Sequence, residues 1–462
     1  MPAINKIAVI GLDCAEPGLV FDAWLDRLPN IRRLMQSGLH GQLESCMPPI
    51  TVPAWSCMTT SKDPGTLGVY GFRNRKDHTY DGLSIATNLA IKEPRVWDLL
   101  AAAGKKSISI GVPQTYPITR PPNGLQVTCF LTPGIDSDYT HPKELKQEIA
   151  SVVGEYIIDC KDFRTENKKW LLEQIYEMTD KRFKLCKHLL ATKPWDLFWM
   201  VEMGTDRIHH GFWQFMDKQH HRYEAGNPFE HAIRDYYAHL DKLIGELLET
   251  IELNTTAVWI VSDHGAKRMD GGFCFNDWLI REGLLTMKQP VTAKNAFKFD
   301  EVDWTKTKVW GEGGYYARCF INREGRESQG QVKAAEYEAF RDEMIRRIEA
   351  LRDHRGRPMN NRAYKPENIY RKVNGVAPDL VVIFGDLHWR SVGTIGNPDV
   401  YTFENDTGPD DANHAQQGMY ILSHPSLGAG KRRDASLYDV TPTILKMMGQ
   451  KATEGMVGTA LV

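Results

Sequence analysis

The chain alternates short runs of apolar and β-branched residues with longer amphipathic segments. The short runs predict β-strands at residues 6–12, 107–112, 196–202, 257–262, 379–384 and 419–422. In the longer segments apolar residues recur every three or four positions, which predicts helices at 95–103, 171–191, 229–251 and 333–351. This alternation is typical of a largely parallel sheet with helices packed on it, so the sequence predicts an α/β fold.

The region from about 265 to 413 breaks this rhythm. It mixes aromatic, charged and glycine residues, as in VWGEGGYYARCF and NREGRESQG. We find no repeat period, sustained heptad or low-complexity tract in the sequence, which argues against a solenoid or a coiled coil. We therefore expect residues 1–462 to form one elaborated domain, with an insertion within about 265–413 that lies near the functional site.

The charge balance excludes some classes of partner. The 57 Lys and Arg residues nearly balance the 59 Asp and Glu residues, so net charge favours neither a nucleic-acid polymer nor an anionic membrane. No apolar run approaches the roughly 20 residues of a membrane span. The start, MPAINKIAVIGLD, enters a strand without an apolar signal core, and the eight cysteines form no CxxC pair. These features predict a cytoplasmic protein with a small or locally recognised substrate.

Two carboxylates follow predicted strands. Asp13 ends KIAVIGLD, and Asp263 follows AVWIVS, with His264 after it. Ligands of open α/β sheets bind at the carboxyl ends of the strands, so these side chains are candidates for one site. Each Asp alone is more simply a turn or cap residue. Together with an imidazole, they form an oxygen and nitrogen donor set for a divalent cation. Cys14, beside Asp13, is expected to have a packing role.

A second donor pair follows the predicted strand at 196–202. In GTDRIHHGFW, Asp206 and His210 are four residues apart and would share one face of a helix, where they could bind a metal. His209 would point about 100° away from His210, which favours a structural role for it. His414, in DDANHAQQG, is by itself an ordinary loop histidine. It becomes a candidate only as a third ligand beside Asp206 and His210.

Thr51 lies in PPITVPAW, where Pro53 suits the first turn of a helix. We expect Thr51 to be the helix cap, which is the simplest role for a threonine there. The same position also suits a nucleophile, because the positive end of the helix would stabilise a bound anion. The sequence alone leaves both roles open.

The motifs taken together resemble the alkaline phosphatase superfamily, and more closely its type I phosphodiesterase/nucleotide pyrophosphatase branch. The resemblance runs nearly end to end. Its motifs are IGLDCAEP, LPNIRRLMQSG, PPITVPAW, VPQTYP, TDRIHH, VSDHG, the NH…G segment and SLYDVTPTILKMMG. It implies an alkaline-phosphatase-like three-layer sandwich and an enzyme that hydrolyses a small phosphate ester.

The resemblance also implies two metal sites and a nucleophile. One metal would be held by Asp13, Thr51, Asp263 and His264, and the other by Asp206, His210 and His414. Zinc is the usual metal of the family, with manganese or magnesium as alternatives. Thr51 would be the nucleophile and would form a covalent phospho-threonine.

One position departs from the family pattern. Nucleotide pyrophosphatases usually carry Asn three residues after the nucleophile, but this chain has Ala54. Arg73, Lys267 or backbone N–H groups could replace the missing donor. Trp55 and Tyr116 are further candidate substrate contacts, although core packing is the simpler role for an aromatic residue.

Several alternatives stay open from the sequence. A phosphomonoesterase, a phosphonate hydrolase or a phosphotransferase could use the same groups. The absence of a CxPxR-type context at Thr51 argues against a sulfatase. A metal-binding scaffold without turnover is the alternative from a different class, and the full ligand set argues against it.

Overall fold

The computed structural model describes residues 4–462, and its largest element is a ten-stranded sheet. The path through the sheet is β22-β2-β21-β9-β1-β8-β5-β6-β7, and β23 pairs with β2. The strands are β1 (Lys6–Leu12), β2 (Leu39–Glu44), β5 (Ser107–Ile110), β6 (Gly124–Val127), β7 (Thr140–His141), β8 (Leu197–Glu202), β9 (Thr256–Val261), β21 (Gln417–Ser423), β22 (Lys431–Arg432) and β23 (Ala435–Ser436).

The centre of the sheet is parallel. β1 pairs in parallel with β8 and β9, and β5 pairs in parallel with β8 and β6. β8 and β9 are fully buried, as expected for parallel strands covered on both faces. The register sets Leu12 beside Glu202 and Gly11 beside Val261, so the three central strands end at one level. Residues that follow these strands therefore meet at one edge of the sheet.

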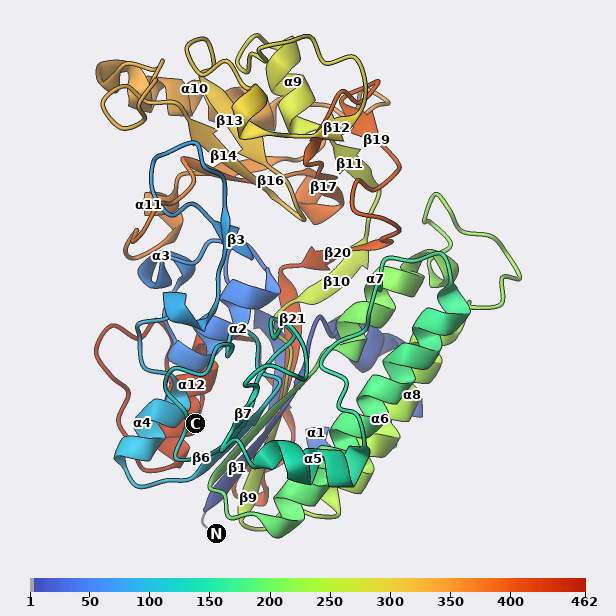
Figure 1. Cartoon of the computed structure of the whole chain (residues 1–462). Helices are drawn as coiled ribbons and strands as arrows, with labels where there is room; N and C mark the ends of the chain where they lie inside the picture. The colour runs from blue at the N-terminus through green and yellow to red at the C-terminus, as the bar shows by residue number, and fades with distance from the viewer. Residues whose placement is uncertain (1–3) are drawn as a thin grey trace.

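Helices cover both faces of the sheet, which gives the expected three layers (Figure 1). The helices drawn in green beside α1 lie on one face, and those drawn in blue pack with the C-terminal α12 on the other. The first group is α1 (Pro29–Met35), α5 (Leu145–Val153), α6 (Lys168–Thr192), α7 (Gly204–Met216) and α8 (Ala232–Leu248). The second group is α2 (Thr51–Thr60), α3 (Pro64–Leu67), α4 (Val96–Ala102) and α12 (Val440–Met447).

A smaller unit lies above the carboxyl edge of the sheet (Figure 1). Its four-stranded sheet has the order β13-β14-β16-β15, and its core is a separate cluster of buried apolar residues between Phe273 and Val400. The elements are β11 (Gly271–Phe273), α9 (Phe275–Arg281), β12 (Asn295–Ala296), β13 (Val309–Glu312), β14 (Ala317–Ile321), α10 (Tyr337–Glu349), β15 (Arg362–Tyr364), α11 (Pro366–Ile369), β16 (Leu380–Ile383), β17 (Trp389–Ser391), β18 (Thr394–Ile395) and β19 (Tyr401–Thr402). β10 (Gly265–Arg268) and β20 (Ala412–Ala415) form an antiparallel pair that connects this unit to the main sheet.

An early segment of the chain also reaches this unit. β3 (Arg73–Asn74) and β4 (Ser84–Ile85) form a hairpin next to it. Tyr80 in the hairpin stacks on Trp304 with ring centroids 4.0 Å apart, and its hydroxyl donates to Asn322. The part of the protein that lies above the carboxyl edge of the sheet therefore includes residues from outside 265–413.

Most predicted elements are present, with two differences of placement. The predicted strand at 379–384 is β16, which belongs to the smaller sheet and not to the central one. The predicted strand at 419–422 is β21, which joins the central sheet but runs antiparallel to β9. An apolar run shows that a strand is buried, but it does not show in which sheet or direction the strand pairs.

Candidate active site

The first group of polar side chains lies where β1 and β9 end. Asp13 directly follows β1, and Asp263 and His264 follow β9. The Nε2 atom of His264 lies 3.1 Å from an Asp263 oxygen and 3.9 Å from an Asp13 oxygen. The Thr51 hydroxyl oxygen lies 3.3 Å from the same Nε2. The structure thus brings together all four residues that the resemblance gives to one metal.

One carboxylate oxygen of Asp13 and one of Asp263 accept a hydrogen bond from a neighbouring N–H group. The Trp55 indole N–H donates to Asp13 over 2.6 Å, and the Cys14 backbone N–H donates to Asp263 over 3.2 Å. Trp55 packs against Gly11, where an added Cβ would lie only 2.5 Å from the indole. The other oxygen of each carboxylate is buried without a hydrogen-bond partner among the described residues. Burial raises the pKa of Asp13 and of Asp263 well above their ordinary values.

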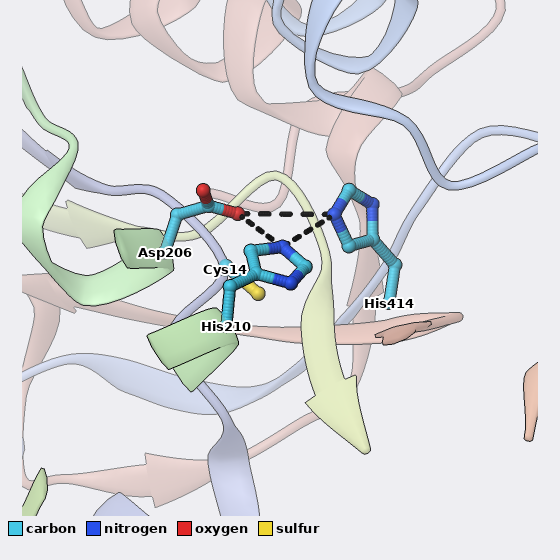
Figure 2. Close-up of side chains that lie close together, drawn as sticks. All are labelled: Cys14, Asp206, His210 and His414. Carbon is cyan, nitrogen blue, oxygen red and sulfur yellow. Dashed lines mark hydrogen bonds and ion pairs between the residues drawn. The ribbon is translucent and has the colours of Figure 1, made fainter. Parts of the chain in front are cut away.

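The second group is carried by helix α7 and strand β20 (Figure 2). The Nε2 atom of His210 lies 3.1 Å from an Asp206 oxygen and 3.3 Å from the Nε2 of His414. The His414 Nε2 lies 3.7 Å from the same Asp206 oxygen, which has no hydrogen-bond partner among residues 4–462. As expected, Asp206 and His210 share one helix face. His209 points elsewhere, and its Nε2 lies 3.2 Å from the Tyr237 hydroxyl.

The imidazoles are oriented through their Nδ1 atoms. Nδ1 of His414 lies 2.8 Å from the Pro49 carbonyl, and Nδ1 of His264 lies 3.1 Å from the Gly265 carbonyl. A carbonyl can only accept, so both Nδ1 atoms carry the proton and both Nε2 atoms offer a lone pair. Burial agrees with neutral rings, because it lowers the pKa of His264 to about 4 and holds the pKa of His414 well below its usual range.

His210 has a different environment. Its Nδ1 lies 2.7 Å from Asp410 and 3.0 Å from the Ala412 carbonyl. Burial alone would lower the pKa of His210, but the carboxylates of Asp410 and Asp206 on either side raise it to about 10. Tyr315 stacks on the ring at 4.9 Å and donates to Asp410. This residue belongs to the smaller unit, so that unit takes part in ordering the site.

Cys14 lies close to the second group (Figure 2). Its thiol donates to the Gly265 carbonyl over 3.4 Å, and burial raises its pKa well above the ordinary value. Both observations are compatible with the packing role expected from the sequence.

Thr51 occupies a slightly different position from the expected one. Helix α2 begins at Thr51, so Ile50 is the cap residue and the prediction of Thr51 as the cap is wrong by one position. No side chain caps this helix end. The Thr51 hydroxyl is therefore not used for capping and faces the His264 ring instead. Propensity locates a helix start, but it does not fix the first residue.

A cavity of about 470 Å³ opens beside Thr51, Asp206, His210 and His414. Of the four substrate contacts suggested by the sequence, only Arg73 lines it. Trp55 is fully buried behind Asp13, and Lys267 pairs with Asp386 at 3.1 Å. Tyr116 is also not part of the wall. These three positions do not support the expected substrate contacts.

Much of the wall was not expected from the sequence. It includes the aromatic residues Phe130, Phe163, Tyr315 and Tyr316 and the cations Arg164, Arg207, Arg318 and Arg390. Arg207 directly follows Asp206, donates to it and pairs with Asp159 at 2.6 Å. The GEGGYYARCF segment supplies part of the wall, and its mixed aromatic and charged composition was the one available signal.

Comparisons with known proteins agree with this architecture. The chain resembles the solved structure of human ectonucleotide pyrophosphatase/phosphodiesterase 5 at 13% identity and a TM-score of 0.56, with 97% of this chain and 96% of that chain covered. The murine protein gives 12% identity and a TM-score of 0.54, with the same coverage. An inactive threonine-to-alanine form of the murine protein, in complex with AMP, gives 12% and 0.55, also with the same coverage. None of the curated proteins matches the chain.

The fold is that of an alkaline-phosphatase-like α/β protein, with clustered carboxylates and histidines at the carboxyl edge of its sheet. The sequence profile of the type I phosphodiesterase/nucleotide pyrophosphatase family matches residues 7–410, and the chain belongs to this family. It is accordingly a hydrolase of phosphoric esters. No helix within residues 4–462 is long and apolar enough to cross a membrane.

Proposed function

We propose that the protein hydrolyses a small phosphodiester or pyrophosphate through a covalent intermediate on Thr51, at a site for two divalent cations. The observation that supports this most directly is the hydroxyl of Thr51, which is free of capping duty and lies 3.3 Å from His264, between two clusters of candidate ligands. The inactive threonine-to-alanine form of the murine neighbour agrees with a threonine nucleophile.

The donor atoms fit two cations. Three buried carboxylate oxygens, one each from Asp13, Asp206 and Asp263, have no hydrogen-bond partner among the described residues. An unpaired buried carboxylate is costly, and a cation beside each would remove that cost. The Nε2 atom of His264 lies near the unpartnered Asp263 oxygen, and the Nε2 atom of His414 lies near the unpartnered Asp206 oxygen. Both Nε2 atoms offer a lone pair. Oxygen and imidazole nitrogen together suit zinc, and also manganese.

The ligand sets of this proposal follow the two clusters. Asp13, Thr51, Asp263 and His264 would hold one cation, and Asp206, His210 and His414 would hold the other. When bound, such a pair lowers the pKa of a coordinated hydroxyl or water and stabilises negative charge on phosphoryl and leaving-group oxygens. Zinc is the metal that we propose.

The proposed reaction consists of two successive displacements at phosphorus, the first by Thr51 and the second by water. The Thr51 oxygen attacks phosphorus, its bond to phosphorus forms, and the bond to the leaving-group oxygen breaks. The leaving oxygen takes up the proton that the Thr51 hydroxyl lost and departs. A water oxygen next attacks the phospho-threonine, the bond from phosphorus to Thr51 breaks, and the threonine regains its proton. The α2 N-terminus, which no side chain of the described residues caps, stabilises the charged phosphoryl group.

Ala54 offers no side-chain donor at the position where the family usually has Asn. The cavity wall contains arginines instead, and Arg73 is the one that was also expected from the sequence. AMP in the murine neighbour supports a small nucleotide-like ester as one substrate class. A cytoplasmic location is also part of the proposal, supported by eight cysteines that are all free and buried.

The test combines metal content with turnover. Metal-loaded wild-type protein is expected to hydrolyse bis-p-nitrophenyl phosphate and to lose this activity after chelation. Thr51→Ala is expected to abolish turnover with little effect on the midpoint of unfolding, because the hydroxyl makes no capping bond. Thr51→Ser should retain activity, since it keeps the attacking oxygen.

Thr60→Ala is the matched control. Thr60 is buried in the same helix, but its hydroxyl donates to the Ser56 carbonyl and lies away from the site. This variant should keep both metal content and turnover. Substantial turnover by Thr51→Ala with normal metal content would contradict the covalent mechanism. Wild-type protein with two bound metal ions and no turnover of any phosphate ester would contradict the proposed activity.

A further inference from the structure

The cavity wall is rich in arginine, and most of that charge is already neutralised by the protein. Arg164 donates to Asp410 over 3.0 Å and to the Tyr315 hydroxyl over 2.8 Å. Arg390 pairs with Asp406 at 3.0 Å. Arg207 pairs with Asp159 and Asp206, as described above. These three arginines order the site, and little of their charge is left for a ligand.

Arg318 and Arg73 differ from the other three. Arg318 is 7% exposed, and one of its terminal nitrogens donates to the backbone carbonyl of Arg73. Its Nε is buried without a partner among the described residues, although the side chain lines the cavity. Arg73 is exposed at the cavity, and its side chain makes no hydrogen bond or ion pair within residues 4–462. The two side chains thus present unused N–H donors and positive charge from one wall.

Glu312 is the one acidic group of this wall that has no close partner. It lies opposite Arg318 in the pairing of β13 with β14, but neither Arg318 nor Arg73 forms an ion pair with it among the described residues. Burial raises the pKa of Glu312, while the two arginines lower it. A single half-buried carboxyl cannot neutralise two guanidinium groups, so this wall keeps a positive charge.

We propose that the substrate carries a second anionic group, a carboxylate or a phosphate, which Arg318 and Arg73 bind while the ester phosphorus lies at Thr51. This inference rests on the proposed function and narrows it to a substrate class. An oxyanion would occupy the unused N–H donors and complement the charge of the wall. The volume of about 470 Å³ suits a small molecule. Phe72, next to Arg73, and Phe130 give apolar surface for the part between the two anionic groups.

The test uses three p-nitrophenyl phosphodiesters that differ only in their second arm: ethyl, carboxymethyl and 2-phosphoethyl. Metal-loaded wild-type protein should turn over the two charged esters with kcat/KM roughly tenfold or more above that of the ethyl ester, the effect of one or two charge-assisted hydrogen bonds. The ratio between the carboxymethyl and 2-phosphoethyl esters distinguishes a carboxylate from a phosphate. Arg318→Gln and Arg73→Gln should both lower the preference for charged arms.

Arg73→Gln removes a side chain that has no hydrogen-bond or ion-pair partner within residues 4–462, so its effect cannot be ascribed to a folding defect. Arg281→Gln is the control, because Arg281 pairs with Asp399 on the surface and is absent from the cavity wall. Equal kcat/KM for the ethyl and both charged esters would overturn the substrate class and leave the proposed function standing. A fourth ester with a 2-aminoethyl arm is the cationic comparison, and a preference for it would also overturn the substrate class and would indicate Glu312 as the recognition group. Failure to turn over any of the esters would overturn both proposals.

Discussion

His210 has a carboxylate on each side of its ring. Nδ1 lies 2.7 Å from Asp410, and Nε2 lies 3.1 Å from Asp206. The two carboxylates raise the pKa of His210 to about 10 against the effect of burial, so the ring is protonated at neutral pH. A cation bound between Asp206, His210 and His414 must replace the proton on Nε2. Metal binding should therefore release a proton from His210.

The magnitude follows from this pKa. Between pH 7 and pH 9, which lie below about 10, His210 should release close to one proton for each metal ion bound between Asp206, His210 and His414. The apparent metal affinity should then rise about tenfold for each pH unit in this interval. Titration calorimetry in two buffers with different ionisation enthalpies measures the number of protons directly.

Asp410→Asn tests the cause of this effect. The variant keeps an acceptor for Nδ1 but removes one of the two charges that hold the proton, so proton release should fall. When no proton competes with the metal for His210, Asp410→Asn should also bind metal roughly tenfold more weakly. The reason is that Asp410 orients the imidazole of His210, and an oriented imidazole is a better ligand. The Ala412 carbonyl, at 3.0 Å from Nδ1, limits this loss. Asp406→Asn is the control, since Asp406 pairs with Arg390 and not with His210.

Two outcomes would refute this reasoning. One is zinc binding by wild-type protein without proton release between pH 7 and pH 9. The other is the same proton release in wild-type protein and in Asp410→Asn.

Three further predictions follow from the site. The folded pKa of His210 lies above the ordinary value of 6.5, so metal-free protein should lose stability as pH rises from about 6.5 to about 10. The urea midpoint of unfolding measures this loss. Bound zinc should suppress the pH dependence. His210→Ala should lose one metal ion by elemental analysis, whereas His209→Ala should keep both and lose only stability. Trp55→Phe should weaken the metal site at Asp13, because it removes the 2.6 Å hydrogen bond, and unchanged zinc affinity in this variant would contradict that role.

Sequence reasoning located the central part of the site because local patterns determine it. Asp13 and Asp263 follow apolar runs, and parallel strands deliver the residues after them to one edge. The four-residue spacing of Asp206 and His210 set them on one face of α7, as expected. His414 could not be placed from local pattern, since its position depends on the pairing of β10 with β20.

The surroundings of the site were not predictable in the same way. Tyr315 and Arg318 line the cavity and Asp410 lies beside His210, because the fold of the smaller unit brings together segments that are far apart in sequence. Trp55 was a candidate substrate contact with core packing as its simpler role, and the structure shows it packed on Gly11 with its indole N–H donating to Asp13. An aromatic residue next to a nucleophile has no sequence signal that tells a substrate contact from a buried support.

The stereochemical course at phosphorus tests the central claim most directly. The substrate is a p-nitrophenyl phosphorothioate diester of one configuration, hydrolysed by metal-loaded wild-type protein in isotopically labelled water. Two successive in-line displacements, the first by Thr51 and the second by water, predict retention of configuration. Inversion would show a single displacement by water and would contradict the covalent role of Thr51.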